Sequence, residues 1–192
     1  MRKRPPAAAH IAAIEVEPAP CEGLSNFTIR ESDRLAQPTV CVSPDLPICG
    51  ECLAELFNPW NQRYGYPYIN CTNCGPRYSV ILALPYDRPN TTMHPWPMDR
   101  YCKDQYHDPA NRRFHAQPVA CPACGPQYFL SEGTMTIVDG GEAIEKTANL
   151  LREGKIVAIK GLGGYHLACD ARNPEANALY HATHADRAGG CH

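Results

Sequence analysis

The sequence lacks an excess of charge of either sign, and it lacks any long apolar run. Its 18 lysines and arginines against 20 aspartates and glutamates leave a net charge of −2, whereas proteins that bind nucleic acid non-specifically carry a clear basic excess. No apolar stretch approaches the ~20 residues of a membrane-spanning helix. The composition therefore argues against nucleic acid and against a membrane as partners.

A recognisable secretory leader is also missing. The basic residues 1–4 precede a short apolar stretch that His10 interrupts, and Glu15 and Glu17 follow at once, whereas a signal peptide needs an unbroken apolar centre. We therefore expect a reducing, cytoplasmic environment, in which cysteine pairs bind metal more often than they form disulfides. The cysteine count agrees, because 11 is odd and most of the cysteines stand in C-x-x-C pairs.

A repeat of fifty residues organises the middle of the chain. At that shift Cys52, Cys71 and Cys74 recur as Cys102, Cys121 and Cys124. The same shift matches Pro59 with Pro109, Asn61 with Asn111, Arg63 with Arg113, Gly75 with Gly125 and Tyr78 with Tyr128. A gapless match of this kind indicates two copies of one module.

The first copy has the spacing of a four-cysteine zinc site, Cys49-x2-Cys52-x18-Cys71-x2-Cys74. Two residues between cysteines form a tight turn that presents both sulfurs to one ion at about 2.3 Å, and two such turns complete a tetrahedron. We therefore predict a structural zinc ion there. Buried core thiols are an alternative, and so is a redox pair, although a redox C-x-x-C usually opens a helix in a βαβ unit.

One glycine directly follows the second cysteine pair of each copy, Gly75 in the first and Gly125 in the second. Glycine tolerates a positive φ, so we expect these positions to let backbone N–H groups point at the sulfurs. So small a unit buries little apolar surface, and we expect zinc to supply much of its stability.

The second copy departs from the first at one ligand position, where Asp99 replaces a cysteine. Aspartate can bind zinc through oxygen at about 2.0–2.2 Å. We therefore predict a second set made of Asp99, Cys102, Cys121 and Cys124. In one alternative a histidine takes the fourth place, the candidates being His94, His107 and His115. In another the second site is weak or empty.

Four arginines accompany the cysteines, namely Arg63, Arg77, Arg112 and Arg113. They either offset the negative charge of the thiolate sites or lie on the solvated surface.

Short elements are predicted around the modules. Residues 53–57 read as a helical turn that Asn58 and Pro59 end. The alternating tyrosines of 64–68 indicate a strand, with 78–84 as its partner. Residues 11–16 and 27–30 could form strands, and Cys21 and Cys41 read as ordinary thiols.

From Gly141 the pattern becomes that of an α/β domain. Apolar residues of 144–151 fall at helical spacing, and Gly154 is a predicted helix stop. Residues 155–160 read as a buried strand, 161–164 as a turn and 165–169 as a further strand. Asn173 and Pro174 have the pattern of a helix start, whereas residues 181–192 read as an unstructured end.

Several segments are specific enough to resemble a known family. They are 44–56 around Cys49, 68–77 around Cys71, 84–93, and 112–126 around Cys121. These segments resemble the zinc region of the HypF family, the carbamoyltransferases of hydrogenase maturation. Residues 154–171 resemble the opening of the family's YrdC-like nucleotide-binding domain, and the resemblance covers roughly residues 10–176.

The resemblance implies a fold of small zinc-stabilised α+β modules of the ribbon or knuckle type in tandem, followed by an incomplete α/β YrdC-like domain. The implied divisions are 1–42 as the exit of an acylphosphatase-like domain, 43–84 and 85–132 as zinc fingers, and 133–192 as the YrdC-like part. The family makes a carbamoyl adenylate from carbamoyl phosphate and ATP and passes the carbamoyl group to the C-terminal cysteine of a HypE-type partner. The implied nucleotide-pocket residues are Lys160, Gly161, Gly163, Gly164 and His166, although the glycine motif alone is weak and favours a plain turn.

The chain departs from the family pattern at Asp99, where members usually carry cysteine, and after Ala176, where a basic run is expected. We therefore expect a fragment of the carbamoyltransferase that binds structural zinc and does not transfer carbamoyl groups alone. The alternative function is a stand-alone zinc-ribbon adaptor for protein or RNA. Its contact residues would be Tyr64, Tyr66 and Trp96.

Overall fold

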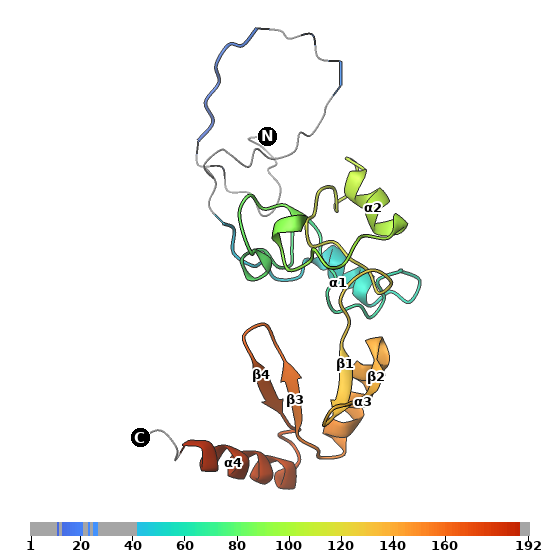
Figure 1. Ribbon diagram of the computed structural model, residues 1–192, viewed down its shortest axis with the longest axis vertical. Coiled ribbons are helices and arrows are strands. Elements are labelled where there is room, and N and C mark those ends of the chain that lie inside the picture. The colour runs from blue at the N-terminus through green and yellow to red at the C-terminus, as the bar shows by residue number, and fades with distance from the viewer. Residues whose placement is uncertain (1–10, 12, 21–22, 24, 27–41, 189–192) are drawn as a thin grey trace. The chain divides into compact units, whose positions relative to one another are not determined.

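The computed structural model describes residues 11, 13–20, 23, 25–26 and 42–188, with side chains as far as Thr183 (Figure 1). The chain divides into two compact units, Met1–Pro126 and Gln127–His192. Within the described part, no helix has the length and apolar character needed to cross a membrane.

The two helices of the first unit begin at equivalent positions of the repeat. Helix α1 spans Gly50–Leu56, and its N-cap is Cys49, whose sulfur accepts the N–H of Cys52 at 3.5 Å. Helix α2 spans Arg100–His107, and its N-cap is Asp99, whose Oδ1 accepts the N–H of Cys102 at 2.8 Å. The predicted helical turn over 53–57 is thus confirmed, one turn longer toward the N-terminus.

The segment after each helix is a chain of tight turns, not the strand predicted for 64–68. The N–H of Tyr64 donates to the carbonyl of Asn61, and the N–H of Tyr66 to that of Arg63. These bonds span three residues, so the backbone has no extended ladder. The strand prediction was wrong because the alternating tyrosines lie in successive turns. These turns bury Tyr66 and leave Tyr64 exposed.

The two copies share these turns in atomic detail. Gly65 has φ +66° and donates its N–H to Leu56, while His115, fifty residues on, has φ +51° and donates to Tyr106. A positive φ is uncommon for a residue with a side chain, although histidine is among the more tolerant types. The shared backbone path confirms that the copies are one fold.

The other predicted strands of the first unit do not form in the described residues. Tyr78–Val80 is a 3-10 helix (η1) and Arg88–Asn90 is another (η2). The residues that follow them, Ile81 and Thr91, pair in a single antiparallel β-bridge. Residues 11 and 13–16 are not in a strand. The predicted strand at 27–30 and the thiols of Cys21 and Cys41 lie outside the described residues.

The core of the first unit is small, and cysteines are at its centre. One buried cluster joins Tyr66, Ile69 and Met93 to cysteines of the first copy, and it also contains Ala120 of the second copy. A second cluster packs Ala116 and Val119 around Cys102 and Cys121. The two fingers therefore share apolar contacts.

The second unit starts with a hairpin and a helix. Strands β1 (Phe129–Glu132) and β2 (Met135–Asp139) pair antiparallel, and helix α3 (Gly140–Arg152) packs on them. The predicted helix stop is confirmed: Gly154 has φ +79° and donates to Leu151, while Lys155 donates to Leu150. This pair of bonds is the Schellman arrangement.

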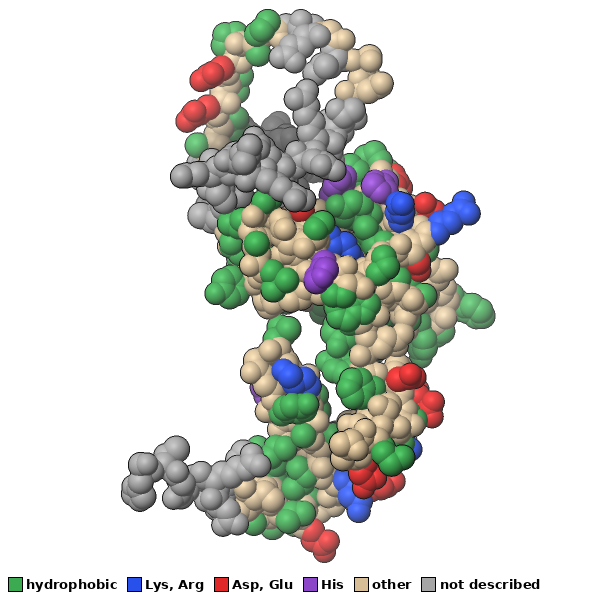
Figure 2. Space-filling view, in the orientation of Figure 1, with side chains coloured by type: hydrophobic (Ala, Val, Ile, Leu, Met, Phe, Trp, Pro, Cys, Tyr) green, Lys and Arg blue, Asp and Glu red, His purple; other side chains and the backbone are tan. Residues whose placement is uncertain are grey.

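A second hairpin and a long helix follow. Strands β3 (Val157–Lys160) and β4 (Tyr165–Ala168) pair antiparallel, which confirms two of the predicted strands. Strand β3 is mostly exposed and not buried as predicted, because a two-stranded sheet leaves its faces open and no third strand joins it among the described residues. Hydrophobic side chains accordingly appear on the visible faces of both units (Figure 2).

Helix α4 spans Pro174–Ala188, with Asn173 as the predicted N-cap: its Oδ1 accepts the N–H groups of Glu175 and Ala176 at 3.0 and 3.1 Å. The prediction of an unstructured end from residue 181 was wrong as far as Ala188, where helix α4 ends. The segment has little apolar periodicity, but it is rich in alanine, the strongest helix former.

Candidate metal centres

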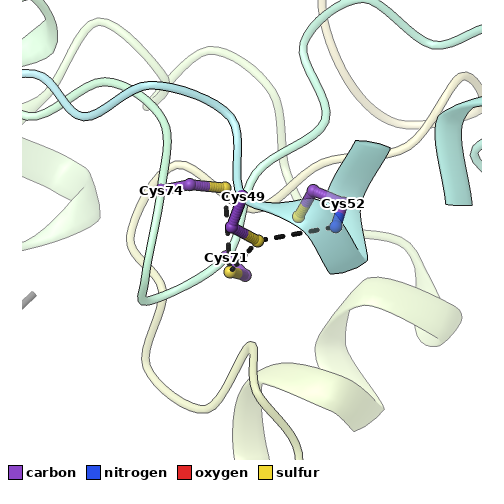
Figure 3. Close-up of side chains that lie close together, drawn as sticks. All are labelled: Cys49, Cys52, Cys71 and Cys74. Carbon is purple, nitrogen blue, oxygen red and sulfur yellow. Dashed lines mark hydrogen bonds between the residues drawn. The ribbon is translucent and has the colours of Figure 1, made fainter. Parts of the chain in front are cut away.

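The four cysteines of the first copy meet at one point. Cys49 and Cys52 lie at the start of α1. Cys71 and Cys74 lie in a turn whose counterpart in the second copy contains Cys121 and Cys124. Figure 3 shows their sulfurs turned toward one another. The sulfur of Cys71 lies 3.7 Å from that of Cys49 and 3.7 Å from that of Cys74. We call this set the first cluster.

These distances fit a zinc ion. A tetrahedron with Zn–S bonds of about 2.3 Å has sulfur–sulfur edges of about 3.8 Å. The ligand atoms of the first cluster all lie within 4.8 Å of one another, and three of the four cysteines are buried. The set is thus close enough for one small cation and too confined for a solvated one.

The acid–base chemistry of the first cluster also favours a cation. The hydrogen bond between Cys52 and Cys71 lowers the pKa of Cys71 to about 4 and raises that of Cys52, whose pKa burial raises further. Packed thiols cannot all ionise, since each negative charge opposes the next. A divalent cation removes that opposition and allows all four to be thiolates.

The second cluster consists of Asp99, Cys102, Cys121 and Cys124, again with ligand atoms within 4.8 Å of one another. Asp99 divides its carboxylate between two tasks: Oδ1 caps α2, and Oδ2 lies 3.1 Å from the sulfur of Cys121. Burial opposes ionisation of Asp99, but the N–H of Cys102 and the thiol of Cys121 outweigh burial and lower its pKa. The structure thus presents Asp99 as an ionised oxygen donor in the place of Cys49.

The histidine alternative has no support in this geometry. Among the described residues, neither cluster includes a histidine. His107 and His115 instead contact the ring of Tyr106, at centroid distances of 5.2 and 4.6 Å.

The two module glycines serve different purposes. Gly75 has φ +92°, as expected, whereas Gly125 does not have a positive φ. A Cβ on Gly125 would overlap the hydroxyl of Tyr66 and come 2.5 Å from the Cβ of Ala120, so this position needs glycine for space. Neither glycine N–H points at sulfur, because they donate to the carbonyls of Leu46 and Cys121.

The N–H groups that do approach sulfur come from non-glycine residues. Cys52 donates to Cys49, and Asn73 donates to Cys71 at 3.3 Å.

The arginines lie inside the first unit and not on its solvated surface. Arg63 and Arg113 are 0% and 2% exposed, and their guanidinium groups approach the sulfurs of Cys102 and Cys52. Arg112 donates to Cys52 at 2.8 Å. Arg77 is also buried, but it bonds to backbone carbonyls, including those of Cys71 and Cys74.

The predicted nucleotide residues lie at the tip of the β3–β4 hairpin. Lys160 and His166 are exposed at the two ends of the turn, and the Lys160 ammonium donates to the carbonyl of Gly161 at 2.9 Å. Gly161 donates to Gly164, and a Cβ on Gly161 would meet the His166 ring at 2.8 Å. The hairpin brings these residues together without enclosing them.

One of the three contact residues predicted for an adaptor is buried. Tyr66 is 3% exposed and its hydroxyl donates to the carbonyl of Pro126. Tyr64 and Trp96, the other two predicted contact residues, are 55% and 36% exposed.

Comparisons with known proteins match these same regions. The family described as the HypF finger matches residues 48–81 and 100–131, and the Sua5, YciO and YrdC family, described as telomere recombination, matches residues 149–185. The second finger match begins directly after Asp99, so it does not decide the role of that residue.

Curated relatives and solved structures give the same name. The chain is 51% identical to "Carbamoyltransferase HypF" of Synechocystis over 167 residues, 86% of this chain and 22% of the relative. It is 46% identical to that of Rhodobacter capsulatus over 183 residues, 95% of this chain and 24% of the relative.

The crystal structure of HypF from T. kodakarensis is 52% identical with a TM-score of 0.69, over 74% of this chain and 19% of that one. A full-length HypF crystallised in a phosphate- and nucleotide-bound form is 54% identical with a TM-score of 0.62, over 71% and 18%. The chain thus spans about a quarter or less of the length of these proteins. Its paired cysteine clusters, its fifty-residue repeat and these matches show that the chain belongs to the HypF family of carbamoyltransferases, of which it spans the tandem zinc fingers and part of a Sua5/YrdC-type domain.

Proposed function

We propose that the first and second clusters each hold one structural zinc ion, the second with Asp99 as its oxygen ligand. The observation that carries this proposal is the equivalence of the clusters. Each begins at the N-cap of a helix, each takes its last two ligands from a C-x-x-C turn, and each has sulfur–sulfur distances of 3.7 Å. Bound zinc would offset part of the ligands' negative charge and link α1 and α2 to their loops.

The role of this zinc is to hold structure. Closed sites with four protein ligands leave no position for water or substrate, which is the mark of structural zinc and not of catalytic zinc. All four positions of each cluster are supplied by the protein. The chemistry of the whole carbamoyltransferase therefore lies elsewhere.

For the whole protein, we infer the reaction that its family membership favours. Carbamoyl phosphate and ATP would give a carbamoyl adenylate, and the carbamoyl group would pass to the C-terminal cysteine of a HypE-type partner in the cytoplasm. The relatives named carbamoyltransferase and the nucleotide-bound form of one HypF support this proposal. Lys160, Gly161, Gly163, Gly164 and His166 would form one edge of the nucleotide pocket in the YrdC-like part proposed for 133–192.

Zinc content per chain tests the metal proposal. Mass spectrometry of the intact protein under native conditions should find two zinc ions, and the same preparation after acid denaturation should find none. Asp99→Cys should keep two ions and bind the second more tightly, because a thiolate replaces a carboxylate. One ion in the native protein and two in Asp99→Cys would show that Asp99 is not a working ligand.

A turnover assay tests how much of the chemistry these 192 residues carry. We expect no ATP consumption dependent on carbamoyl phosphate, because the β3–β4 hairpin leaves its nucleotide-pocket residues exposed. Measurable turnover by the zinc-loaded chain would contradict this expectation.

A further inference from the structure

The two fingers exchange arginines. Arg63 lies in the first finger, between Cys52 and Cys71, yet its guanidinium bonds to the second: Nε donates to the carbonyl of Ala120 at 2.7 Å and NH2 to the sulfur of Cys102 at 3.1 Å. Its third donor reaches the hydroxyl of Tyr101 at 3.2 Å, and its plane lies over that ring.

The second finger returns the same contact. Arg113 is the repeat counterpart of Arg63, and its Nε donates to the carbonyl of Asn70 at 3.0 Å, while NH2 lies 3.9 Å from the sulfur of Cys52. Asn70 and Cys52 are in turn the counterparts of Ala120 and Cys102. The exchange is therefore reciprocal, as in a two-fold interface where residue i contacts j and j contacts i.

The arginines that bond to the other finger's sulfurs bring one net positive charge to each cluster, in addition to Arg88, whose charge also acts on Cys102 and Cys124. Beside the first cluster, Arg112 and Arg113 both pair with the carboxylate of Glu55, which leaves one net positive charge. Beside the second cluster Arg63 supplies one positive charge, and the counterpart of Glu55 is the neutral Gln105. Four thiolates around zinc carry a formal charge of −2, and three thiolates with one carboxylate carry the same, so each site faces one net guanidinium charge from the other finger.

The buried guanidinium groups make zinc binding in one finger depend on the structure of the other finger. A buried cation is costly unless it is paired and hydrogen-bonded. Arg63 is held in position by its own finger, since its N–H donates to Asn61 and its carbonyl accepts from Tyr66. Zinc in the first cluster orders the loop between Cys52 and Cys71. It therefore positions the Arg63 guanidinium, which donates to the sulfur of Cys102.

We propose that the two metal sites are thermodynamically coupled: zinc in either cluster raises the zinc affinity of the other through the exchanged arginines Arg63 and Arg113. This inference rests on the proposed zinc sites. Arg63 is a positioning and charge-balancing residue for the second site and not a ligand. Partners that hydrogen-bond to metal ligands typically change metal affinity by about 10- to 100-fold, and coupling between two sites is typically about 5- to 150-fold.

Cobalt titration of the full chain measures the coupling directly, since thiolate-bound Co²⁺ absorbs in the near ultraviolet and can be competed with zinc. The zinc affinity of the second site is compared between the native chain and Cys71→Ser/Cys74→Ser, in which the first site is disabled. We expect at least a fivefold loss of affinity in the disabled chain. Equal affinities in the two chains would overturn the coupling while leaving zinc binding intact.

Two arginine variants assign the coupling to the exchange. Arg63→Gln should weaken zinc at the second site by about 10-fold or more and reduce its dependence on the first. Arg88→Gln is the matched control, because Arg88 is also buried and its charge also acts on Cys102 and Cys124, but its guanidinium bonds to the carbonyls of Gln117, Val119 and Trp96 and to no sulfur. Coupling that survives in Arg63→Gln, or that falls equally in Arg88→Gln, would refute the role of the exchange.

The remaining outcomes are also distinct. If Arg63→Gln does not fold, Arg113→Gln reports the same coupling from the other side through the affinity of the first site. If neither site of the native chain binds zinc, the proposed function itself fails and the coupling fails with it.

Discussion

Asp99 should show two separable roles, and two substitutions can divide them. Its Oδ1 caps helix α2 and its Oδ2 faces the second cluster. Asp99→Asn keeps a good N-cap but replaces an anionic oxygen with a neutral amide, whereas Asp99→Ala removes both cap and ligand. Asparagine caps helices about as well as aspartate, and loss of the cap to alanine costs about 0.5–2 kcal/mol.

The expected magnitudes follow from those roles. If Asp99→Asn weakens zinc at the second site 100-fold, the folded state loses about 2.7 kcal/mol of zinc-derived stability at saturating metal. Asp99→Ala should lose the same amount plus about 1 kcal/mol for the cap. Asp99→Cys should lose none of the metal term, because Cys49 performs both tasks in the first finger.

The assay is thermal unfolding of each variant with a fixed excess of zinc, together with competition by a chelator of known affinity. The expected order of stability, from highest to lowest, is Asp99→Cys, the native chain, Asp99→Asn and Asp99→Ala. If Asp99→Asn holds zinc as tightly as the native chain, Asp99 is only a helix cap and the second site uses three ligands from the protein.

Three further predictions concern the first unit. Strong chelation should abolish its circular dichroism signal, because structural zinc contributes about 10–16 kcal/mol in small modules; an unchanged spectrum with metal fully removed would contradict this. Gly125→Ala should destabilise the unit by about 1–3 kcal/mol, since the new methyl overlaps Tyr66 and Ala120, whereas Gly50→Ala, which has open space at the start of α1, should be neutral or slightly stabilising in the same unfolding experiment. For Glu55, burial acts against the charged form, but Arg113 and Arg112 outweigh it and lower its pKa; its stabilising effect is therefore complete above the unfolded value near 4.5 and is lost as pH falls through the lower folded value. The stability difference between the native chain and Glu55→Gln should be constant above about pH 5 and shrink below it, and a difference that grows on acidification would be inconsistent with this ion pair.

The sequence was sufficient to predict which side chains gather in each cluster and where several elements lie. Cysteine spacing restricts geometry strongly, so a repeat of fifty residues was enough to predict which residues gather in each cluster. The helix stop at Gly154 and the cap at Asn173 were predictable because they depend on local backbone chemistry.

Other features depended on contacts that no local pattern contains. The tyrosines of 64–68 alternate as in a strand, but their N–H groups close turns, and Tyr66 is buried by residues of the other finger. Gly125 looks equivalent to Gly75, yet its reason for being glycine is the approach of Tyr66 from about sixty residues away in sequence. The inward direction of Arg63 was not predictable either, since its partner sulfur belongs to the other copy.

The exchange of arginines gives a physical reason for finding the fingers as a pair. A module that buries one guanidinium against a thiolate of a neighbour is incomplete alone, because its own cluster then lacks the matching cation. Two copies in a reciprocal arrangement satisfy each other at once, as a two-fold interface does. The positions at which the two copies differ are consistent with that requirement: Asp99 carries the same charge as a thiolate in the place of Cys49, and Glu55 is present only where Arg112 adds a second cation. These differences therefore preserve the charge that each finger presents to the other.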